Sequence, residues 1–154
     1  MSDDSHLYQT AVEWTTERRG QATAPGLPGL EVAAPPEFDG HAGVWTPEHL
    51  FVSAIASCFM TTFLAIAQAS RLDFAAFAAS AEGRLEKVEG GYRMTEVTLR
   101  PRLTLRRLDD RERAERILVK AERACLISRS VISTVLLAPA VISASADEAP
   151  HPAT

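Results

Sequence analysis

Stretches in which apolar and polar side chains alternate predict the β-strands of this chain, because successive side chains of a strand point to opposite faces. The first stretch is residues 8–14, YQTAVEW, and shorter candidates follow at 20–24 and 30–34 around the turn-forming sequence PGLPG. Two longer stretches, 73–88 and 92–105, flank the sequence EGG. This arrangement predicts a β-hairpin.

A proline interrupts the clearest of these strands. Pro101 lies on the apolar face of residues 92–105 and has no N–H group to donate. The strand is therefore predicted to lie at a sheet edge or to carry a bulge. The other apolar residues of that face are Val97, Leu99, Leu103 and Leu105. Residues 135–144, VLLAPAVISA, predict a last strand that a second proline breaks.

Helical signals replace alternation in two segments. Thr46 can cap the first free amides of a helix, Pro47 suits its first position, and Glu48 favours the positive end of the helix dipole. A helix is predicted over about 47–70. A second, amphipathic helix is predicted over about 109–128, with an inward stripe formed by Ala114, Ile117, Leu118, Ala121 and Cys125.

The first predicted helix contains an uncharged run. The twenty residues from Leu50 to Ala69 carry no formal charge, and this is about the length that a membrane-spanning helix needs. Five hydrogen-bonding side chains interrupt the run, so burial in protein is favoured over a membrane span. Because a chain of 154 residues covers a helix of about 37 Å poorly, the pattern predicts an intimate homodimer.

Composition and charge exclude several classes of protein. Hydrophobic residues at 46% and charged residues at 23% are typical of a soluble globular domain, and a net charge of -4 argues against a general nucleic-acid binder. The arginines between Arg100 and Arg113 alternate with acidic residues and are interpreted as a solvated face. One domain is predicted over 7–144, between flexible ends at 1–6 and 145–154. The N-terminal sequence does not resemble a signal peptide, which predicts a cytoplasmic protein.

The candidate chemistry centres on two cysteines, Cys58 and Cys125, which both fall on inward helix faces. A reducing compartment does not favour a permanent disulfide. A pair is therefore interpreted as catalytic or sensing, and the alternative is that both thiols are small core residues. A thiol becomes nucleophilic only as a thiolate, which in an apolar site needs a nearby cation or hydrogen-bond donor. No zinc site is predicted, because the histidines are scattered: His6, His41, His49 and His151.

Three segments together resemble the OsmC/Ohr family of osmotically inducible and organic hydroperoxide resistance proteins. They are WTTERRG, TPEHLFVSAIASCFMTTFLAIA and ACLISRSV, and the resemblance spans about residues 7–144. It implies an α+β fold with antiparallel sheets around a long central helix, in an intertwined homodimer with active sites at the subunit interface. It also implies a cysteine-based peroxidase without a cofactor. The expected partners are a hydroperoxide and a thiol reductant such as a lipoyl-type dithiol, and neither nucleic acid nor a membrane.

The same resemblance gives roles to four residues. Cys58 matches the peroxidatic cysteine and Cys125 matches the resolving cysteine. Arg18 matches the site arginine by its place two residues before a glycine, with Arg19 as the alternative, and Glu48 matches the acid of the Pro-Glu pair. In this assignment the arginine lowers the thiol pKa and orients the peroxide, while the carboxylate holds the guanidinium in place.

The implied reaction is the reduction of organic hydroperoxides. Cys58 becomes a sulfenic acid, Cys125 closes an intramolecular disulfide, and an external thiol resets it. The alternative is a catalytically silent OsmC-like protein that binds a hydrophobic ligand or a protein partner. One departure from the family pattern is Leu126, which stands where the resolving motif often has proline.

The helix geometry adds an expectation about the shared site. Glu48 and Cys58 are ten residues apart on one predicted helix, which is about 15 Å along its axis. One arginine does not easily bridge that distance. If the two residues share a site, Glu48 is therefore expected to come from the partner subunit.

Overall fold

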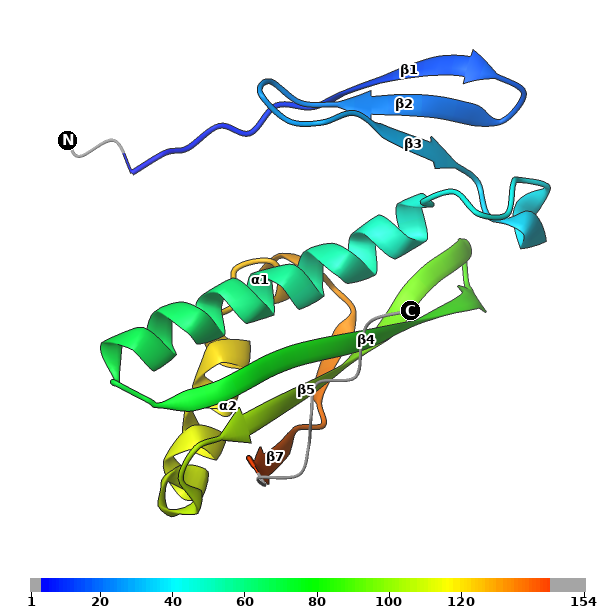
Figure 1. The fold of residues 1–154 in the computed structure, drawn as a ribbon. Helices are drawn as coiled ribbons and strands as arrows, with labels where there is room; N and C mark the ends of the chain where they lie inside the picture. The colour runs from blue at the N-terminus through cyan, green and yellow to red at the C-terminus, as the bar shows by residue number, and fades with distance from the viewer. Residues whose placement is uncertain (1–3, 145–154) are drawn as a thin grey trace. The chain divides into compact units, whose positions relative to one another are not determined.

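The computed structural model describes residues 4–144. The predicted C-terminal tail, 145–154, lies outside this range, as do residues 1–3 of the predicted N-terminal segment 1–6. The chain divides into two compact units, Met1–Phe51 and Val52–Thr154. Figure 1 labels both α-helices and most of the strands, and the two units are described one at a time.

The first unit contains a three-stranded antiparallel sheet, as the alternation predicts. Its strands follow one another in the order β1 (Ala11–Thr16), β2 (Arg19–Thr23) and β3 (Leu30–Ala33). The first strand begins and ends later than the predicted range 8–14. A tight turn joins β1 to β2, with Glu17 at a positive φ of 50°, and this turn carries Arg18. A short 3-10 helix, η1 (Pro36–Phe38), follows the sheet.

The long helix α1 (Pro47–Ala69) begins where the capping residues predict. The Oγ1 of Thr46 accepts a hydrogen bond from the backbone N–H of His49 at 3.2 Å and lies 2.7 Å from the Nδ1 of the same histidine. This bond satisfies one of the amides that the first turn of a helix leaves free. Glu48 therefore lies in the first turn of α1, and Cys58 lies near its middle.

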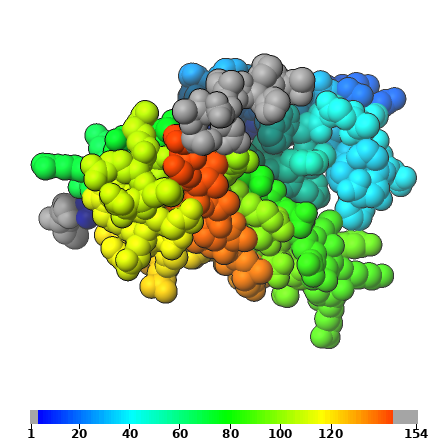
Figure 2. Space-filling model, turned by 60° about the horizontal axis from the view of Figure 1, so that its bottom comes forward, coloured from blue at the N-terminus to red at the C-terminus, as the bar shows by residue number. Residues whose placement is uncertain are grey.

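The second unit is built on the predicted hairpin. β4 (Phe74–Val88) and β5 (Gly91–Leu105) pair antiparallel along almost their whole length. Two short strands, β6 (Thr134–Leu137) and β7 (Ala140–Ser143), then pair with β5. They form one continuous band beside the hairpin in Figure 2, drawn in orange to red.

The expectation of antiparallel sheets is wrong for the second unit, because β6 and β7 both run parallel to β5. Parallel neighbours need a crossover connection rather than a tight turn. The helix α2 (Arg111–Ala124) provides that crossover, between the short 3-10 helices η2 (Leu108–Asp110) and η3 (Ser128–Ser130). The fold is therefore α+β with one antiparallel and one mixed sheet.

The prediction that Pro101 lies at an edge or a bulge is also wrong. β5 is the central strand of its sheet, and the irregularities in the β4–β5 register lie elsewhere. On one side Pro101 lies opposite Ala79 of β4. On the other side β6 ends opposite Leu99 and β7 begins opposite Arg102. On that second side the proline therefore falls in the gap between β6 and β7, where no strand residue is paired with it.

The core of the second unit lies between its two helices and the inward face of β5. The ring of Phe63 stacks on Phe77 of β4 with centroids 4.5 Å apart. At the end of α1, the Nη1 of Arg113 donates a hydrogen bond to the carbonyl of Ser70 at 3.0 Å, so α2 is fixed beside α1. The buried helix residues are Ile55, Phe59, Phe63 and Ala67 from α1 and Ala114, Ile117, Leu118 and Ala121 from α2.

Part of the outer face of α1 is left uncovered within the single chain. Met60 and Leu64 remain 38% and 39% exposed. Within residues 4–144, α1 has the length and apolarity of a membrane span, with a mean hydropathy of 2.1, but core helices of soluble proteins have both properties too. The neighbours of α1 in the second unit pack against its buried residues, Ile55, Phe59, Phe63 and Ala67, and leave this face uncovered.

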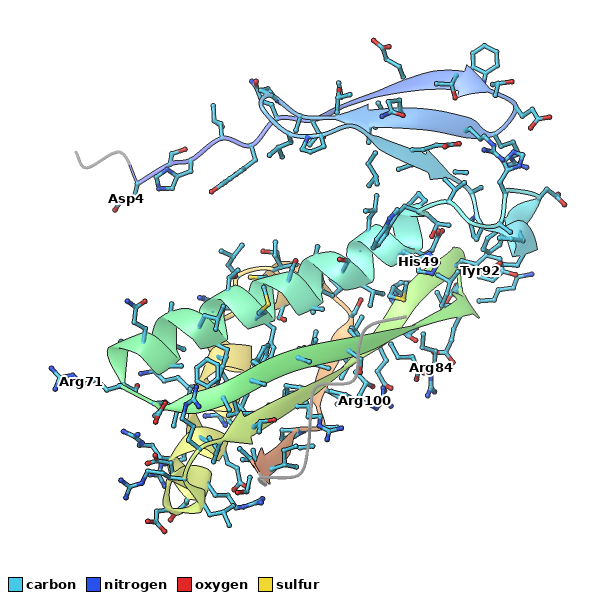
Figure 3. All side chains as sticks on the ribbon, in the orientation of Figure 1. Asp4, His49, Arg71, Arg84, Tyr92 and Arg100 are labelled. Atoms are coloured by element: carbon cyan, nitrogen blue, oxygen red, sulfur yellow. The ribbon has the colours of Figure 1, made fainter. Side chains whose placement is uncertain are left out.

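The arginines of β5 and its neighbours form the solvated face that the sequence predicts. Alternate residues of β5 point away from the buried face, and Arg100 extends into solvent with Arg84 of β4 (Figure 3). Arg100 lies 3.9 Å from Glu82, and Arg84 lies 3.8 Å from Glu96. Exposed pairs of this kind contribute little to stability, so this face is a solvated one that carries charges of both signs.

Replacement of Phe63 by alanine is expected to lower the free energy of unfolding by about 3–5 kcal/mol, because the side chain is fully buried and its removal leaves a cavity. The measurement is urea unfolding followed by circular dichroism. Val119→Ala on α2 is the control, since Val119 is 41% exposed and its truncation should change the free energy by less than about 1 kcal/mol. Equal losses in the two variants would contradict this assignment of the core.

Candidate active site

Cys58 lies on α1, half-buried, with its thiol free. Its sulfur is 4.0 Å from the Oγ1 of Thr62, one helical turn further on. The neighbouring Ile55 and Phe59 are fully buried, so the thiol lies at the border of the apolar core. The thiol of Cys58 is therefore partly accessible to a reactant, and the hydroxyl group of Thr62 lies beside it.

Cys125 ends α2 rather than lying within it, which corrects the predicted helix range of 109–128. Its backbone is extended, with φ −62° and ψ 113°, and its N–H donates to the carbonyl of Glu122 at 3.2 Å. The side chain is fully buried, and its sulfur lies 4.0 Å from the carbonyl oxygen of Ile55 on α1. Ile55 precedes Cys58 by less than one turn, so the resolving candidate lies against the helix that carries the peroxidatic candidate.

The structure places the two cysteine side chains close enough to affect each other's pKa, although the cysteines are far apart in the sequence. Both are free thiols. This proximity is possible because α2 lies beside α1 and ends at the level of Cys58. The two thiols therefore share one site.

The turn after Cys125 supplies the hydrogen-bond donors of the site. The carbonyl of Cys125 accepts from the N–H of Arg129, and the carbonyl of Leu126 accepts from the Oγ of Ser130 at 2.7 Å. Because these two carbonyls accept hydrogen bonds from residues later in the turn, the amides of Leu126 and Ile127 are left to face Cys58. The N–H groups of Ile127 and Leu126 donate to the sulfur of Cys58.

The two thiols have opposite pKa shifts. Burial raises the pKa of Cys58, but the hydrogen bonds from the Ile127 amide, Cys125, Thr62 and the Leu126 amide outweigh it, so the pKa of Cys58 lies below its ordinary value. Burial also raises the pKa of Cys125, and the nearby hydroxyl and amide of Ser128, which favour the thiolate, do not compensate, so that thiol remains protonated to higher pH. The thiolate of the pair is therefore favoured on Cys58.

The structure separates the two arginine candidates. Arg19, on β2, forms an ion pair with Glu31 of the neighbouring strand β3 at 2.7 Å. Arg18 is exposed in the turn before β2, and among residues 4–144 it has no ion-pair partner. A pocket of ≈ 470 Å³ in the first unit is lined by Arg18 and by apolar residues that include Val12 and Trp14. Arg18 is thus the arginine that remains available for a ligand.

Glu48 has an unusual carboxylate. Its Oε2 is buried, and no other residue in the described part of the chain gives it a hydrogen bond. A buried anionic oxygen without a donor is costly. Of the four predicted site residues, Cys58 and Cys125 lie together in the second unit, whereas Arg18 and Glu48 belong to the first.

Sequence reasoning did not find the donors of the site. Thr62 was detectable, since residues four apart lie on one helix face. The backbone amides of Leu126 and Ile127 cannot be identified as donors from the residue types. Ser128 stands out in the sequence only as part of the segment ACLISRSV. Within residues 4–144, no cluster of three or more histidine, cysteine or acidic residues could hold a metal ion.

Comparison with known proteins places the chain in a family. The model of the OsmC-like protein family matches residues 40–137, so the chain belongs to the OsmC-like family. A curated relative is YmaD of Bacillus subtilis, described as uncharacterized, which is 28% identical over 138 residues that cover 87% of this chain and 91% of the relative.

Solved structures agree with this assignment. An OsmC-like protein of unknown function from Vibrio cholerae aligns with a TM-score of 0.79 and 24% identity, over 88% of this chain and 99% of that one. A protein from Legionella pneumophila, described as an organic hydroperoxide resistance protein OsmC and a predicted redox protein, aligns with a TM-score of 0.71 and 26% identity, over 90% of this chain and 99% of that one. The α+β fold is therefore that of OsmC-like proteins.

Replacement of Leu126 by proline is expected to raise the pKa of Cys58, because proline removes one amide donor. The extended backbone of Cys125 suits a residue that precedes proline, so the turn should keep its shape. Alkylation of Cys58 by iodoacetamide at neutral pH should slow by roughly 3- to 10-fold, which is the contribution of one hydrogen bond.

The matched control is Leu126→Ala, which keeps the N–H and removes a side chain that is 63% exposed. Alkylation rates measured across a pH series should be unchanged in the alanine variant. Superimposable titration curves for the proline and alanine variants would show that the Leu126 amide does not stabilise the thiolate.

Proposed function

We propose that this protein is a thiol-dependent peroxidase that reduces organic hydroperoxides in the cytoplasm. The observation that carries the proposal is the proximity of Cys58, whose pKa is lowered by hydrogen bonds, to the fully buried Cys125. The relative that is named an organic hydroperoxide resistance protein and is 26% identical supports the same activity. The buried apolar residues beside Cys58 favour an organic hydroperoxide over hydrogen peroxide.

The residues of the pair suit a two-step reaction. The Cys58 thiolate attacks one oxygen of the hydroperoxide, an S–O bond forms as the O–O bond breaks, and the alcohol leaves with a proton. The sulfur of Cys125 then attacks the sulfenic acid, so a disulfide forms and water is released. An external thiol, for which a lipoyl-type dithiol is the proposed source, returns both cysteines to the reduced state.

The proposed site is completed by Arg18 and Glu48 in a homodimer. The guanidinium of Arg18 has no ion-pair partner among residues 4–144, and the Oε2 of Glu48 is buried without a donor. Each group lacks the partner that the other would provide. The exposed apolar side chains of Met60 and Leu64 on α1 favour a second copy of the chain as the cover of that face.

Thiol titration tests the proposed activity directly. One equivalent of cumene hydroperoxide should remove both free thiols of each chain within the mixing time of a hand assay, and mass spectrometry should show an intramolecular Cys58–Cys125 disulfide. The same amount of hydrogen peroxide should react more slowly. If the thiols remain unreacted after prolonged exposure, the peroxidase activity is rejected. The alternative function, a catalytically silent protein that binds a hydrophobic ligand or a protein partner, would then be favoured.

Mixed dimers should recover activity if the site is shared. A Cys58→Ser subunit keeps Glu48, and a Glu48→Ala subunit keeps Cys58, so only their heterodimer contains one complete site. After subunit exchange at equal amounts, peroxide consumption should reach about one quarter of the wild-type rate, because about half of the dimers are mixed and each has one working site of two.

The control for this experiment replaces the first subunit with the double variant Cys58→Ser/Glu48→Ala, which should recover nothing. Equal rates in the two mixtures would show that Glu48 does not act across a subunit interface.

A further inference from the structure

Ser128 is the one polar group of the site that the proposed oxidation does not use. Its Oγ is buried, and in the described part of the chain no residue completes a hydrogen bond with it while both cysteines are thiols. A buried hydroxyl without an acceptor costs free energy. The group that both the hydroxyl and the amide of Ser128 stabilise is the thiolate form of Cys125.

The two sulfurs differ in accessibility. The side chain of Cys125 is fully buried, whereas Cys58 is only partly covered. Thiol–disulfide exchange requires direct access of the attacking thiolate to one sulfur, and the other sulfur leaves as a thiolate. In a Cys58–Cys125 disulfide, an external reductant can therefore reach the sulfur of Cys58, and the buried sulfur must leave.

This direction of attack has a cost that the site has to offset. A thiolate that forms on Cys125 is placed among apolar side chains, which disfavour its charge. A hydrogen-bond donor close to this sulfur would offset part of that cost. The groups placed to donate to this sulfur are those of Ser128.

We propose that Ser128 promotes the reduction of the disulfide by donating a hydrogen bond to the Cys125 thiolate as it leaves. In this step the thiolate of the reductant attacks the sulfur of Cys58, a mixed disulfide forms there, and the S–S bond breaks with its electron pair on Cys125. The second thiol of a dithiol then attacks the mixed disulfide, which frees Cys58 as a thiolate and leaves the reductant oxidised. Cys125 takes up a proton afterwards.

Ser128 is thus a positioning residue for the reductive half of the cycle, and this role rests on the proposed function only in that it assumes a Cys58–Cys125 disulfide. The oxidative half should not depend on it, because the hydroxyl is not among the groups that donate to Cys58. A general loss of stability would affect both oxidation and reduction. Slower reduction with unchanged oxidation would therefore be specific to the role of Ser128.

The test starts from protein oxidised to the disulfide with diamide, so it does not need peroxidase activity. Reduction by excess dithiothreitol is followed by acid quenching and mass spectrometry. Ser128→Ala should slow this reduction by about 10-fold, the effect of one charge-assisted hydrogen bond, while oxidation of the dithiol form by cumene hydroperoxide changes by less than about twofold. Ser128→Thr keeps the hydroxyl and should restore most of the reduction rate.

The control is Ile132→Ala, which truncates a side chain that is 83% exposed a few residues after the same turn. Its reduction rate should match the wild type. Quenched samples should carry the reductant on Cys58, and an adduct on Cys125 or equal reduction rates for wild type and Ser128→Ala would overturn the proposal. If hydroperoxide leaves the thiols intact while Ser128→Ala still slows reduction of the disulfide, the proposed peroxidase activity is rejected. The proposed role of Ser128 in disulfide reduction is then retained.

Discussion

Replacement of Cys58 by serine is expected to abolish peroxide consumption, with a loss of about 10³-fold or more in the rate with cumene hydroperoxide. A serine hydroxyl is not ionised at neutral pH, and the donors that lower the pKa of Cys58 cannot make it a comparable nucleophile. The measurement is steady-state hydroperoxide loss in the presence of a dithiol. The variant should fold normally, because serine and cysteine are nearly equal in size and the site is only half-buried.

The control for this result is the thiol count of the same variant after exposure to hydroperoxide. Cys125 should remain reduced, since it is fully buried and burial raises its pKa. Rapid oxidation of Cys125 in the Cys58→Ser variant would reverse the roles of the two cysteines. Retained turnover would show that Cys58 does not carry the reaction.

Replacement of Cys125 by serine should leave the oxidation of Cys58 intact but impair turnover. The first equivalent of hydroperoxide is consumed at nearly the wild-type rate, because Thr62 and the amides of Ile127 and Leu126 still donate to Cys58. Turnover with a dithiol should then fall steeply, and excess hydroperoxide should convert Cys58 to its sulfinic acid, since no second sulfur traps the sulfenic acid. Mass spectrometry of the intact variant detects two added oxygen atoms.

Wild-type protein under the same excess is the comparison, and it should accumulate the disulfide before any sulfinic acid. A Cys125→Ser variant that sustains the wild-type turnover would contradict the role of Cys125 as the resolving cysteine. Such a result would favour direct reduction of the sulfenic acid by the external thiol.

The order of elements was largely readable from the sequence. Alternation located the hairpin of β4 and β5, and the Thr-Pro-Glu sequence located the start of α1, because strand pleating and helix capping are local properties. The stripe on α2 was also correct, from Ala114 to Ala121. These features depend on neighbours in the chain, so a single sequence contains the information for them.

The position of Pro101 shows where local reasoning failed. A missing N–H indicates only that one partner is absent, and this is true of an edge strand and also of a gap between two short strands. The sequence of β5 does not contain the information that β6 ends opposite Leu99 and β7 begins opposite Arg102. That arrangement depends on the crossover through α2, which also made the sheet mixed.

The site divides in the same way. The sequence by itself determined that Cys58 lies on the long helix, that Glu48 lies in the first turn of that helix, and that the chain resembles one family. Only the tertiary structure decided that the side chains of Cys58 and Cys125 lie close together, and that the turn after Cys125 directs its amides to Cys58 and Ser128 to Cys125. The physical reason is that a thiolate is stabilised by whichever donors folding places around it, and here those donors are backbone amides and a hydroxyl from a different helix end.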